Sequence, residues 1–173
     1  MQLVIVESPF MHRDPDKGVR RLGTLRNVTY ARLALHDCIR RGEAPYASHL
    51  LYTQPWVLDD DVPEERELGI KAGLLWGLKA DRSVFYTDLG VSTGMVHGAE
   101  AARKAGRPAE NRILDGWDDA ASETPRRTLE RLGLYTSADL DRIEAGFDSI
   151  FASELRELDF GPALRDLVRG GPA

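Results

Sequence analysis

Residues 92–95 have the types and the position needed to hold an anion. Ser92, Thr93, Gly94 and Met95 follow an apolar stretch and stand at the expected start of a helix. The N–H groups in the first turn of a helix have no acceptor within the helix, and the helix dipole makes this end electropositive. A glycine allows close approach of a ligand, and a serine hydroxyl can donate a hydrogen bond. The segment therefore predicts a site for a phosphate or carboxylate group.

The elements that must position this segment alternate along the chain. Apolar or β-branched runs typical of buried strands stand at residues 3–6, 44–52, 82–88 and 111–114. Helical spacing of apolar residues predicts helices between them, at residues 25–41, 63–80 and 92–102. Thr24 is the expected N-cap of the first helix, and Pro63 stands at the start of the second. Alternating strands and helices predict an α/β fold, with a parallel sheet flanked by helices.

Ligands of such sheets bind beyond the carboxyl ends of the strands. This rule places three segments around one crevice: residues 7–9, residues 52–61 and residues 88–94. The predicted anion site lies in the last of them. Asp88, at the end of a strand, is the best-placed candidate for an acid in this crevice. Tyr52 and Trp56 could stack on a base, although aromatic side chains of this kind also serve as core residues.

Composition limits the possible partners. Hydrophobic residues make up 42 % of the 173 residues, charged residues make up 29 %, and the formal net charge is −5. These values are ordinary for a globular protein, and the negative charge argues against a nucleic-acid polymer as partner. Cys38 is the one cysteine, which excludes an internal disulfide and fits a reducing compartment. With no apolar run of membrane-spanning or signal-peptide length, we expect a cytoplasmic protein with no membrane partner.

The chain changes character after residue 117. A polar connector begins at Asp118, and two helices are expected near residues 124–133 and from Ser137 onward. We therefore expect an α/β domain at 1–117 and a helical C-terminal extension at 118–173. Apolar residues recur at three- and four-residue steps from Leu140 to Leu158. They indicate a helix that packs on its own domain or a dimer contact, and the sequence does not separate these alternatives.

Several short motifs, in this order and spacing, carry a family resemblance. They are the segment 4–9 (VIVESP), Arg26-Asn27, Gly42-x-x-Pro45, Arg66-x-x-Gly69, Ser92-x-Gly94-Met95 and Gly106-x-Pro108. With them, residues 1–115 resemble the nucleoside 2-deoxyribosyltransferase-like superfamily, and most closely its compact branch in bacteria and phages. The resemblance implies a flavodoxin-like (Rossmann-like) fold, often as a homodimer or higher oligomer. It also implies a small nucleoside or nucleotide as ligand, and hydrolysis or transfer at the N-glycosidic bond.

The resemblance also implies roles for particular positions. The residues that would bind the phosphate group or lie close to it are Ser8, Pro9, Phe10, Arg26, Asn27, Ser92, Thr93, Gly94 and Met95. Tyr52, Asp59, Asp61 and Arg66 are candidates for the sugar and base. The run Asp59–Asp61 could equally be a solvated loop, and Arg66 could equally pair with Glu64 or Glu67. We expect no cofactor.

This sequence departs from the family pattern at the catalytic position. In the family a glutamate early in the helix after the Ser-x-Gly turn attacks the anomeric carbon or supports its charge. The corresponding position here is Gly98. The nearest carboxylate on the helix is Glu100, which in this register points away from the crevice. Gly98 could leave room for a ligand or for close packing.

The remaining catalytic candidates are Asp88, Glu100 and His97. His97 could act as a general acid or phosphate ligand, or could be a surface residue. The other histidines have no recognisable metal-ligand spacing, so we expect no metal. Three interpretations therefore stay open. The protein is an enzyme acting on an N-glycosidic bond, or a non-catalytic protein that sequesters or senses a nucleotide-derived signal. In the third, the crevice is vestigial and the C-terminal helices form an assembly surface.

Overall fold

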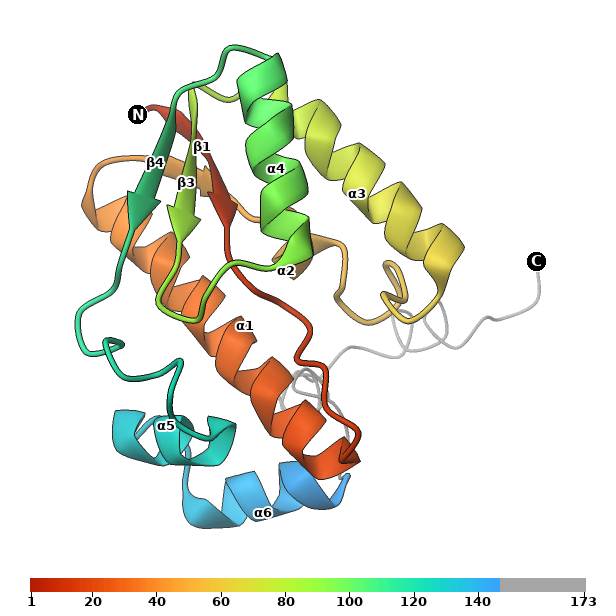
Figure 1. The fold of residues 1–173 in the computed structure, drawn as a ribbon, viewed down its shortest axis with the longest axis vertical. Helices are drawn as coiled ribbons and strands as arrows, with labels where there is room; N and C mark the ends of the chain where they lie inside the picture. Colours follow the sequence, from red (N-terminus) through yellow and green to blue (C-terminus); the bar gives the residue numbers. More distant parts are fainter. Residues whose placement is uncertain (147–173) are drawn as a thin grey trace, which may run out of the picture.

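The computed structural model describes residues 1–146, which form a four-stranded parallel sheet in the order β2-β1-β3-β4 (Figure 1). The strands are β1 (Leu3–Glu7), β2 (Ala44–Tyr46), β3 (Arg82–Tyr86) and β4 (Ala109–Arg112). The helices are α1 (Lys17–Arg40), α2 (Ser48–Leu51), α3 (Pro63–Gly77), α4 (Thr93–Lys104), α5 (Pro125–Leu132) and α6 (Ser137–Ala145). This order is flavodoxin-like, a Rossmann-like arrangement, and confirms the predicted fold class.

Helices cover both faces of the sheet. Helix α1 crosses one face, and α4 lies on the other with α3 beside it (Figure 1). The main core lies between the sheet and α1, where Val4, Val6 and Val84 pack with Val28 and Ala31. Strands β1 and β3 pair at the centre of the sheet, and their crossovers run to opposite sides. Their carboxyl ends therefore form the switch point at which such folds bind ligands.

Helix α1 begins earlier than the sequence predicted. Its N-cap is Asp16, whose side chain accepts a hydrogen bond from the N–H of Val19. Thr24 lies inside the helix and instead accepts a hydrogen bond from the N–H of His12, at 3.2 Å. The segment before Thr24 is polar and rich in basic residues, and from Lys17 onward it is helical. Its basic residues include Arg20 and Arg21, which lie on the first turns of α1.

Two other elements differ from the sequence prediction. The second strand ends at Tyr46, and residues 48–51 form the short helix α2, anchored by buried Leu50. Helix α3 ends at Gly77, before the predicted end at residue 80, and its Leu75 and Trp76 side chains are 66 % and 55 % exposed. The reason is that its inward face carries glycine, so its large apolar side chains lie outside.

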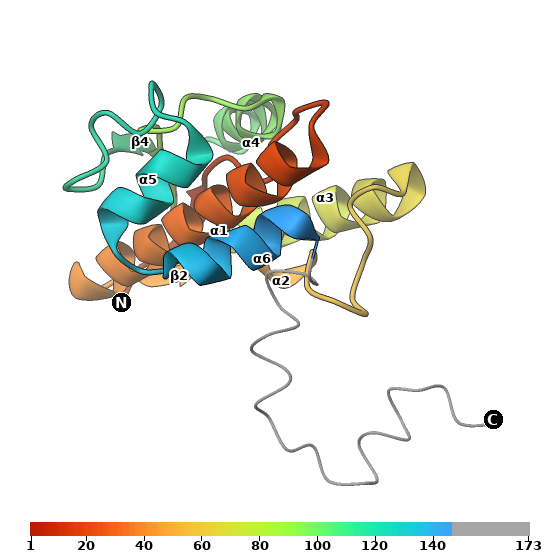
Figure 2. The ribbon, with the colours of Figure 1, turned by 90° about the horizontal axis from the view of Figure 1, so that it is seen from below.

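The helices after β4 pack against α1 (Figure 2). Leu129 of α5 and Leu140 of α6 form a small core with Leu22 and Leu25 of α1. Thr124 caps α5 and the helix ends at Gly133, which agrees with the predicted range; Gly133 adopts the left-handed conformation. Thr136 caps α6, which begins at Ser137. The apolar series from residue 147 onward, with its predicted helix and dimer contact, lies outside the described residues.

A buried ion pair joins the end of β4 to the start of β2. Arg112 donates two hydrogen bonds to the carboxylate of Glu43, at 2.7 and 2.8 Å, and both side chains are less than a tenth exposed. The arginine holds the pKa of Glu43 below its ordinary value. In the described part of the chain, no helix has the length and apolar character needed to cross a membrane.

Candidate functional site

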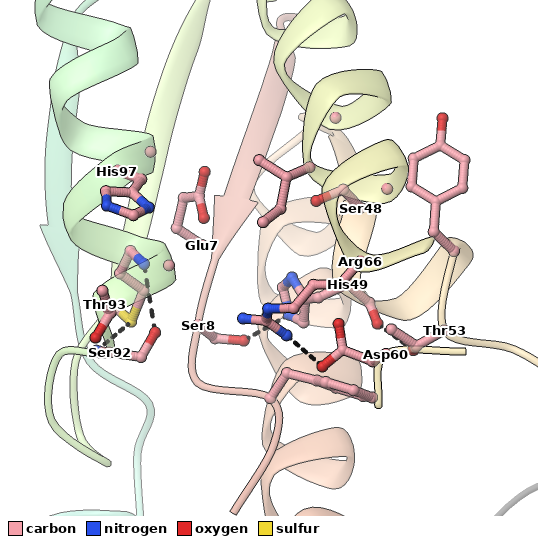
Figure 3. A pocket seen from close by; sticks show the side chains of 18 of the residues that line it. Glu7, Ser8, Ser48, His49, Thr53, Asp60, Arg66, Ser92, Thr93 and His97 are labelled. Atoms are coloured by element: carbon pink, nitrogen blue, oxygen red, sulfur yellow. Dashed lines mark hydrogen bonds and ion pairs between the residues drawn. The ribbon is translucent and has the colours of Figure 1, made fainter. Parts of the chain in front are cut away.

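A pocket of about 490 Å³ opens at the carboxyl ends of β1 and β3, between α2, α3 and α4. Its volume is in the range of small-molecule sites. The residues of the sequence-predicted site that line it are Ser8, Phe10, Tyr52, Arg66, Ser92, Thr93, Gly94, Met95 and His97. Figure 3 shows many of them from close by. Segments far apart in the sequence thus meet at the place where the strand-end rule put the crevice.

The N-terminus of α4 forms one wall of the pocket. Ser92 is the N-cap: its Oγ accepts a hydrogen bond from the N–H of Met95, and its own N–H donates to the sulfur of Met95. These bonds fix the first turn while the N–H groups of Thr93 and Gly94 have no acceptor within the helix. Both residues border the pocket. An anion that enters on this side meets the positive end of the helix dipole.

Ser8 and His49 form a hydrogen-bonded pair on the floor of the pocket. The distance from Ser8 Oγ to His49 Nε2 is 2.9 Å, and Figure 3 shows the two side chains facing each other. Burial lowers the pKa of His49 from 6.5 to about 4, so the imidazole is neutral at pH 7. The pair therefore presents polar atoms to a ligand without adding a charge.

Glycines at four-residue spacing give α3 a flat inner face. Gly69, Gly73 and Gly77 all line the pocket. A Cβ at Gly73 would lie 2.8 Å from the Cβ of Ser48, and a Cβ at Gly77 would lie 3.2 Å from the guanidinium of Arg107. The small residues let α2 and the Arg107 side chain approach the helix backbone. Ile70 and Leu74 complete an apolar wall suited to the flat face of a ring.

The carboxylate of Glu7 enters the pocket from the end of β1. It lies opposite Gly98 of α4: a Cβ at position 98 would lie 2.7 Å from Glu7 Cδ and 3.1 Å from Oε2, and closer still to Oε1. Burial raises the pKa of Glu7 from 4.5 to about 7, and the charge of nearby Arg107 lowers it in part. Gly98 is therefore a glycine because the Glu7 carboxylate fills the space of its side chain.

Arg107 supports this side of the pocket from the loop before β4. Its Nε donates to Ser83 Oγ at 3.0 Å, and its Nη1 donates to the carbonyl oxygen of Gly77 at 2.7 Å. The guanidinium thus bridges β3 and α3 and carries a positive charge next to Glu7. Burial lowers the pKa of Arg107.

Two of the predicted catalytic residues lie away from the pocket. Asp88 Oδ2 accepts hydrogen bonds from the hydroxyl of Tyr30, at 2.6 Å, and from the N–H of Leu114, at 3.0 Å. It therefore joins β3, α1 and the segment after β4, and is not among the residues lining the pocket. Glu100 is exposed on the outer side of α4. The expectation that Asp88 acts in the crevice is corrected by its position, and Glu100 points away from the crevice, as its register predicts, so it is not placed to act there.

Three of the residues assigned to the phosphate region serve packing instead. Arg26 is 7 % exposed and donates from Nη1 to the carbonyl oxygen of Ala120 at 3.2 Å, which holds the connector after β4. Asn27 donates to the carbonyl oxygen of Phe10 at 2.8 Å and so positions a pocket residue from behind. Pro9 is buried beside Ser8, outside the pocket lining.

The acidic run 59–61 divides between two cavities. Asp60 forms an ion pair with Arg66 at the rim of the pocket, as Figure 3 shows. Asp59 and Asp61 line a neighbouring cavity of about 700 Å³ with Trp56. The predicted sugar or base contacts of Asp59 and Asp61 therefore do not face the pocket that holds Ser8 and Ser92. Arg66 pairs with Asp60, not with Glu64 or Glu67.

Sequence reasoning named Glu7 only as part of the crevice segment, and it passed over Arg107 and His49 as site residues. The position of Glu7 as the last residue of a central strand was a usable signal, because side chains at that position project to the ligand edge. No comparable signal marks Arg107. In residues 1–146 no group of three or more His, Cys, Asp or Glu side chains comes together as metal ligands.

Comparisons with known proteins identify a family to which the sequence matches and a solved structure with a distantly similar fold. The model of a family described as a domain of unknown function (DUF7768) matches residues 2–112, which span β1 to β4. No curated protein matches the chain. The fold is similar to a solved 2-deoxyribosyltransferase from the psychrotolerant bacterium Bacillus psychrosaccharolyticus. That similarity has 18 % identity and a TM-score of 0.45, and it covers 80 % of this chain and 95 % of that one.

Proposed function

The chain belongs to the family of the domain of unknown function DUF7768, and we propose that it binds a nucleoside or nucleotide and breaks or exchanges the N-glycosidic bond. The observation that carries the proposal is the pocket at the β1–β3 switch point. One wall offers the helix N-terminus at Thr93 and Gly94, and another offers the flat apolar face of α3. An anionic group and a ring can therefore bind together in one pocket.

The chemistry of the pocket fits this class of reaction. When the base leaves a nucleoside, positive charge develops at the anomeric carbon, and a carboxylate in a partly desolvated site stabilises that charge. Glu7 is such a carboxylate, and His97 borders the same pocket. Arg66 and Arg107 add positive charge for a phosphate group, within an overall acidic protein.

A second function, a non-catalytic nucleotide binder, is favoured by one observation. Gly98 stands where the family resemblance places the catalytic glutamate. A protein that kept the pocket without that group would sequester or sense a nucleotide-derived ligand.

The test is incubation with a panel of nucleosides, deoxynucleotides and dinucleotides. Chromatography detects free base, and thermal shift detects binding, since a ligand of the folded state raises its stability. We expect release of base from at least one member. Stabilisation without release supports the binder, and neither effect across the panel counts against both functions.

A pair of variants connects the effect to the pocket. Arg66→Gln removes a pocket cation, and Arg103→Gln removes an exposed cation from the last turn of α4. We expect the first variant alone to weaken the thermal shift given by phosphorylated ligands. An equal loss in both variants would indicate general charge attraction instead of binding in the pocket.

Further features of the protein are part of the same proposal. We divide the chain into an α/β domain at 1–117 and a helical extension at 118–173; the family match ends at residue 112, which supports a boundary in this region. A homodimer or higher oligomer, a cytoplasmic location, and membership of the compact branch found in bacteria and phages stay predictions.

A further inference from the structure

Glu7 and Gly98 occupy one space from two sides. Gly98 is buried in α4, and the side chain of any larger residue there would run into the Glu7 carboxylate. A glutamate at position 98 would reach the pocket from the helix, whereas Glu7 reaches it from the strand. The family resemblance implies a carboxylate at position 98. In this protein the Glu7 carboxylate, which comes from β1, lies in the same part of the pocket.

We propose that Glu7 is the catalytic carboxylate of this pocket and attacks the anomeric carbon of a bound nucleoside or nucleotide. This inference rests on the proposed function and names the group that performs it. It also explains how the protein can have glycine at position 98 and still be active. The carboxylate comes from β1 instead of α4, but it lies in the same part of the pocket.

The surroundings of Glu7 fit a reacting group. It is the last residue of β1 and pairs with Phe85 of β3, so the sheet fixes its backbone. The pocket has two other carboxylates, and both are engaged: Asp60 pairs with Arg66, and Glu65 accepts a hydrogen bond from the N–H of Asp59. Among the described residues no hydrogen bond or ion pair engages the Glu7 carboxylate.

The reaction balances with water as the co-reactant. A Glu7 oxygen forms a bond to the anomeric carbon while the bond from that carbon to the base nitrogen breaks. The electron pair goes to the nitrogen, which takes a proton from water. A second water then attacks the anomeric carbon and gives its proton to the hydroxide left by the first. The ester bond breaks, and its electron pair returns to the Glu7 carboxylate. The products are the free base and the sugar; a second base in place of the second water gives transfer.

Ionisation of Glu7 predicts how the rate changes with pH. The nucleophile is the carboxylate anion, and burial raises the pKa of Glu7 to about 7. The other charged or titratable groups that line the pocket are His49 on α2, Glu65 and Arg66 on α3, His97 on α4, and Arg13, Tyr52, Asp60 and Arg107 on the connecting segments. His49 is neutral above about pH 5 because its pKa is lowered to about 4. Base release should therefore increase as the pH rises toward 7 and level off above it.

The first test compares three Glu→Gln variants. Glu7→Gln should lower base release about 1000-fold or more, as loss of a nucleophile does, while the thermal shift given by the same ligand is kept. Glu67→Gln, on the exposed side of α3, is the matched control and should release base at the wild-type rate. If Glu7→Gln is as active as the wild type, or if Glu100→Gln alone loses activity, the inference is overturned.

The second test moves the carboxylate back to the helix. Gly98→Glu alone should lower base release, because its side chain displaces the Glu7 carboxylate. The double variant Glu7→Ala with Gly98→Glu removes the collision and should recover part of the lost base release. No recovery in a double variant that folds and binds the ligand contradicts the idea of a shared position.

A trapping experiment identifies the bond directly. A 2-fluoro nucleoside analogue slows breakdown of a glycosyl ester, so intact-mass measurement should detect one added sugar, mapped by peptide analysis to Glu7. A sugar on another residue overturns the inference but leaves the proposed function in place. If the wild type binds nucleotides and releases no base from any of them, the catalytic role of Glu7 fails, and the non-catalytic binder is the function that stands.

Discussion

Replacement of Glu7 by glutamine should change how stability depends on pH, independently of any ligand. Burial raises the pKa of Glu7 from 4.5 to about 7. Between these values the folded protein holds a proton on Glu7 that the unfolded chain has lost. The free energy of unfolding therefore falls as the pH rises from 4.5 and levels off above about 7. Each unit of pKa is worth about 1.4 kcal/mol, so the full effect is about 3 kcal/mol.

Glutamine has nearly the same shape as glutamate and carries no charge at any pH, so it removes this penalty. We expect Glu7→Gln to match the wild type near pH 4.5 and to be more stable by about 2–3 kcal/mol at pH 8. The assay is urea unfolding of both proteins from pH 4.5 to 8, in which the other titrating groups cancel from the difference. A difference that stays constant across this range would refute the raised pKa and the desolvated setting of Glu7.

Three further predictions test other parts of the structure. As the pH falls from 6.5 to 4, the free energy of unfolding of His49→Gln should rise by up to about 3 kcal/mol relative to the wild type. The reason is that the buried imidazole of the wild type stays neutral while the unfolded chain takes up a proton. Urea unfolding at several pH values measures the difference, and equal acid sensitivity of the two proteins would contradict it. Arg112→Met should destabilise by about 3–5 kcal/mol because Glu43 stays buried without its partner, and adding Glu43→Gln should return part of the loss in the same unfolding assay. Leu129→Ala should cost about 2–5 kcal/mol by opening a cavity against α1, and a transition unchanged in calorimetry would show that α5 contributes little.

The sequence predicted helix ends correctly where a few neighbouring residues decide the structure. The cap at Ser92, the start of α3 at Pro63 and the end of α5 at Gly133 depend on residues within one turn. The start of α1 was missed because Asp16 lies in a polar stretch with no visible apolar face. Its helical turns are held by Leu22 and Leu25, whose partners Leu129 and Leu140 are more than a hundred residues away.

The sequence placed some residues of the candidate site correctly and others not, for the same reason. Strand-end position was enough to bring Ser8, Phe10 and the 92–95 turn to one pocket. It was not enough for Asp88, because whether a strand-end side chain faces the ligand depends on Tyr30 and Leu114, which hold it on the other side. Arg26 likewise faces Ala120, which only the path of the chain after β4 brings near.

The sequence by itself determined the alternation of strands and helices, the parallel sheet and the edge at which its loops gather, because hydrophobic periodicity and turn chemistry are local properties. Only the tertiary structure decided which carboxylate occupies that edge. Gly98 belongs to α4 and Glu7 to β1. The Glu7 carboxylate fills the space beside Gly98 only because β1 and α4 pack together in the folded protein.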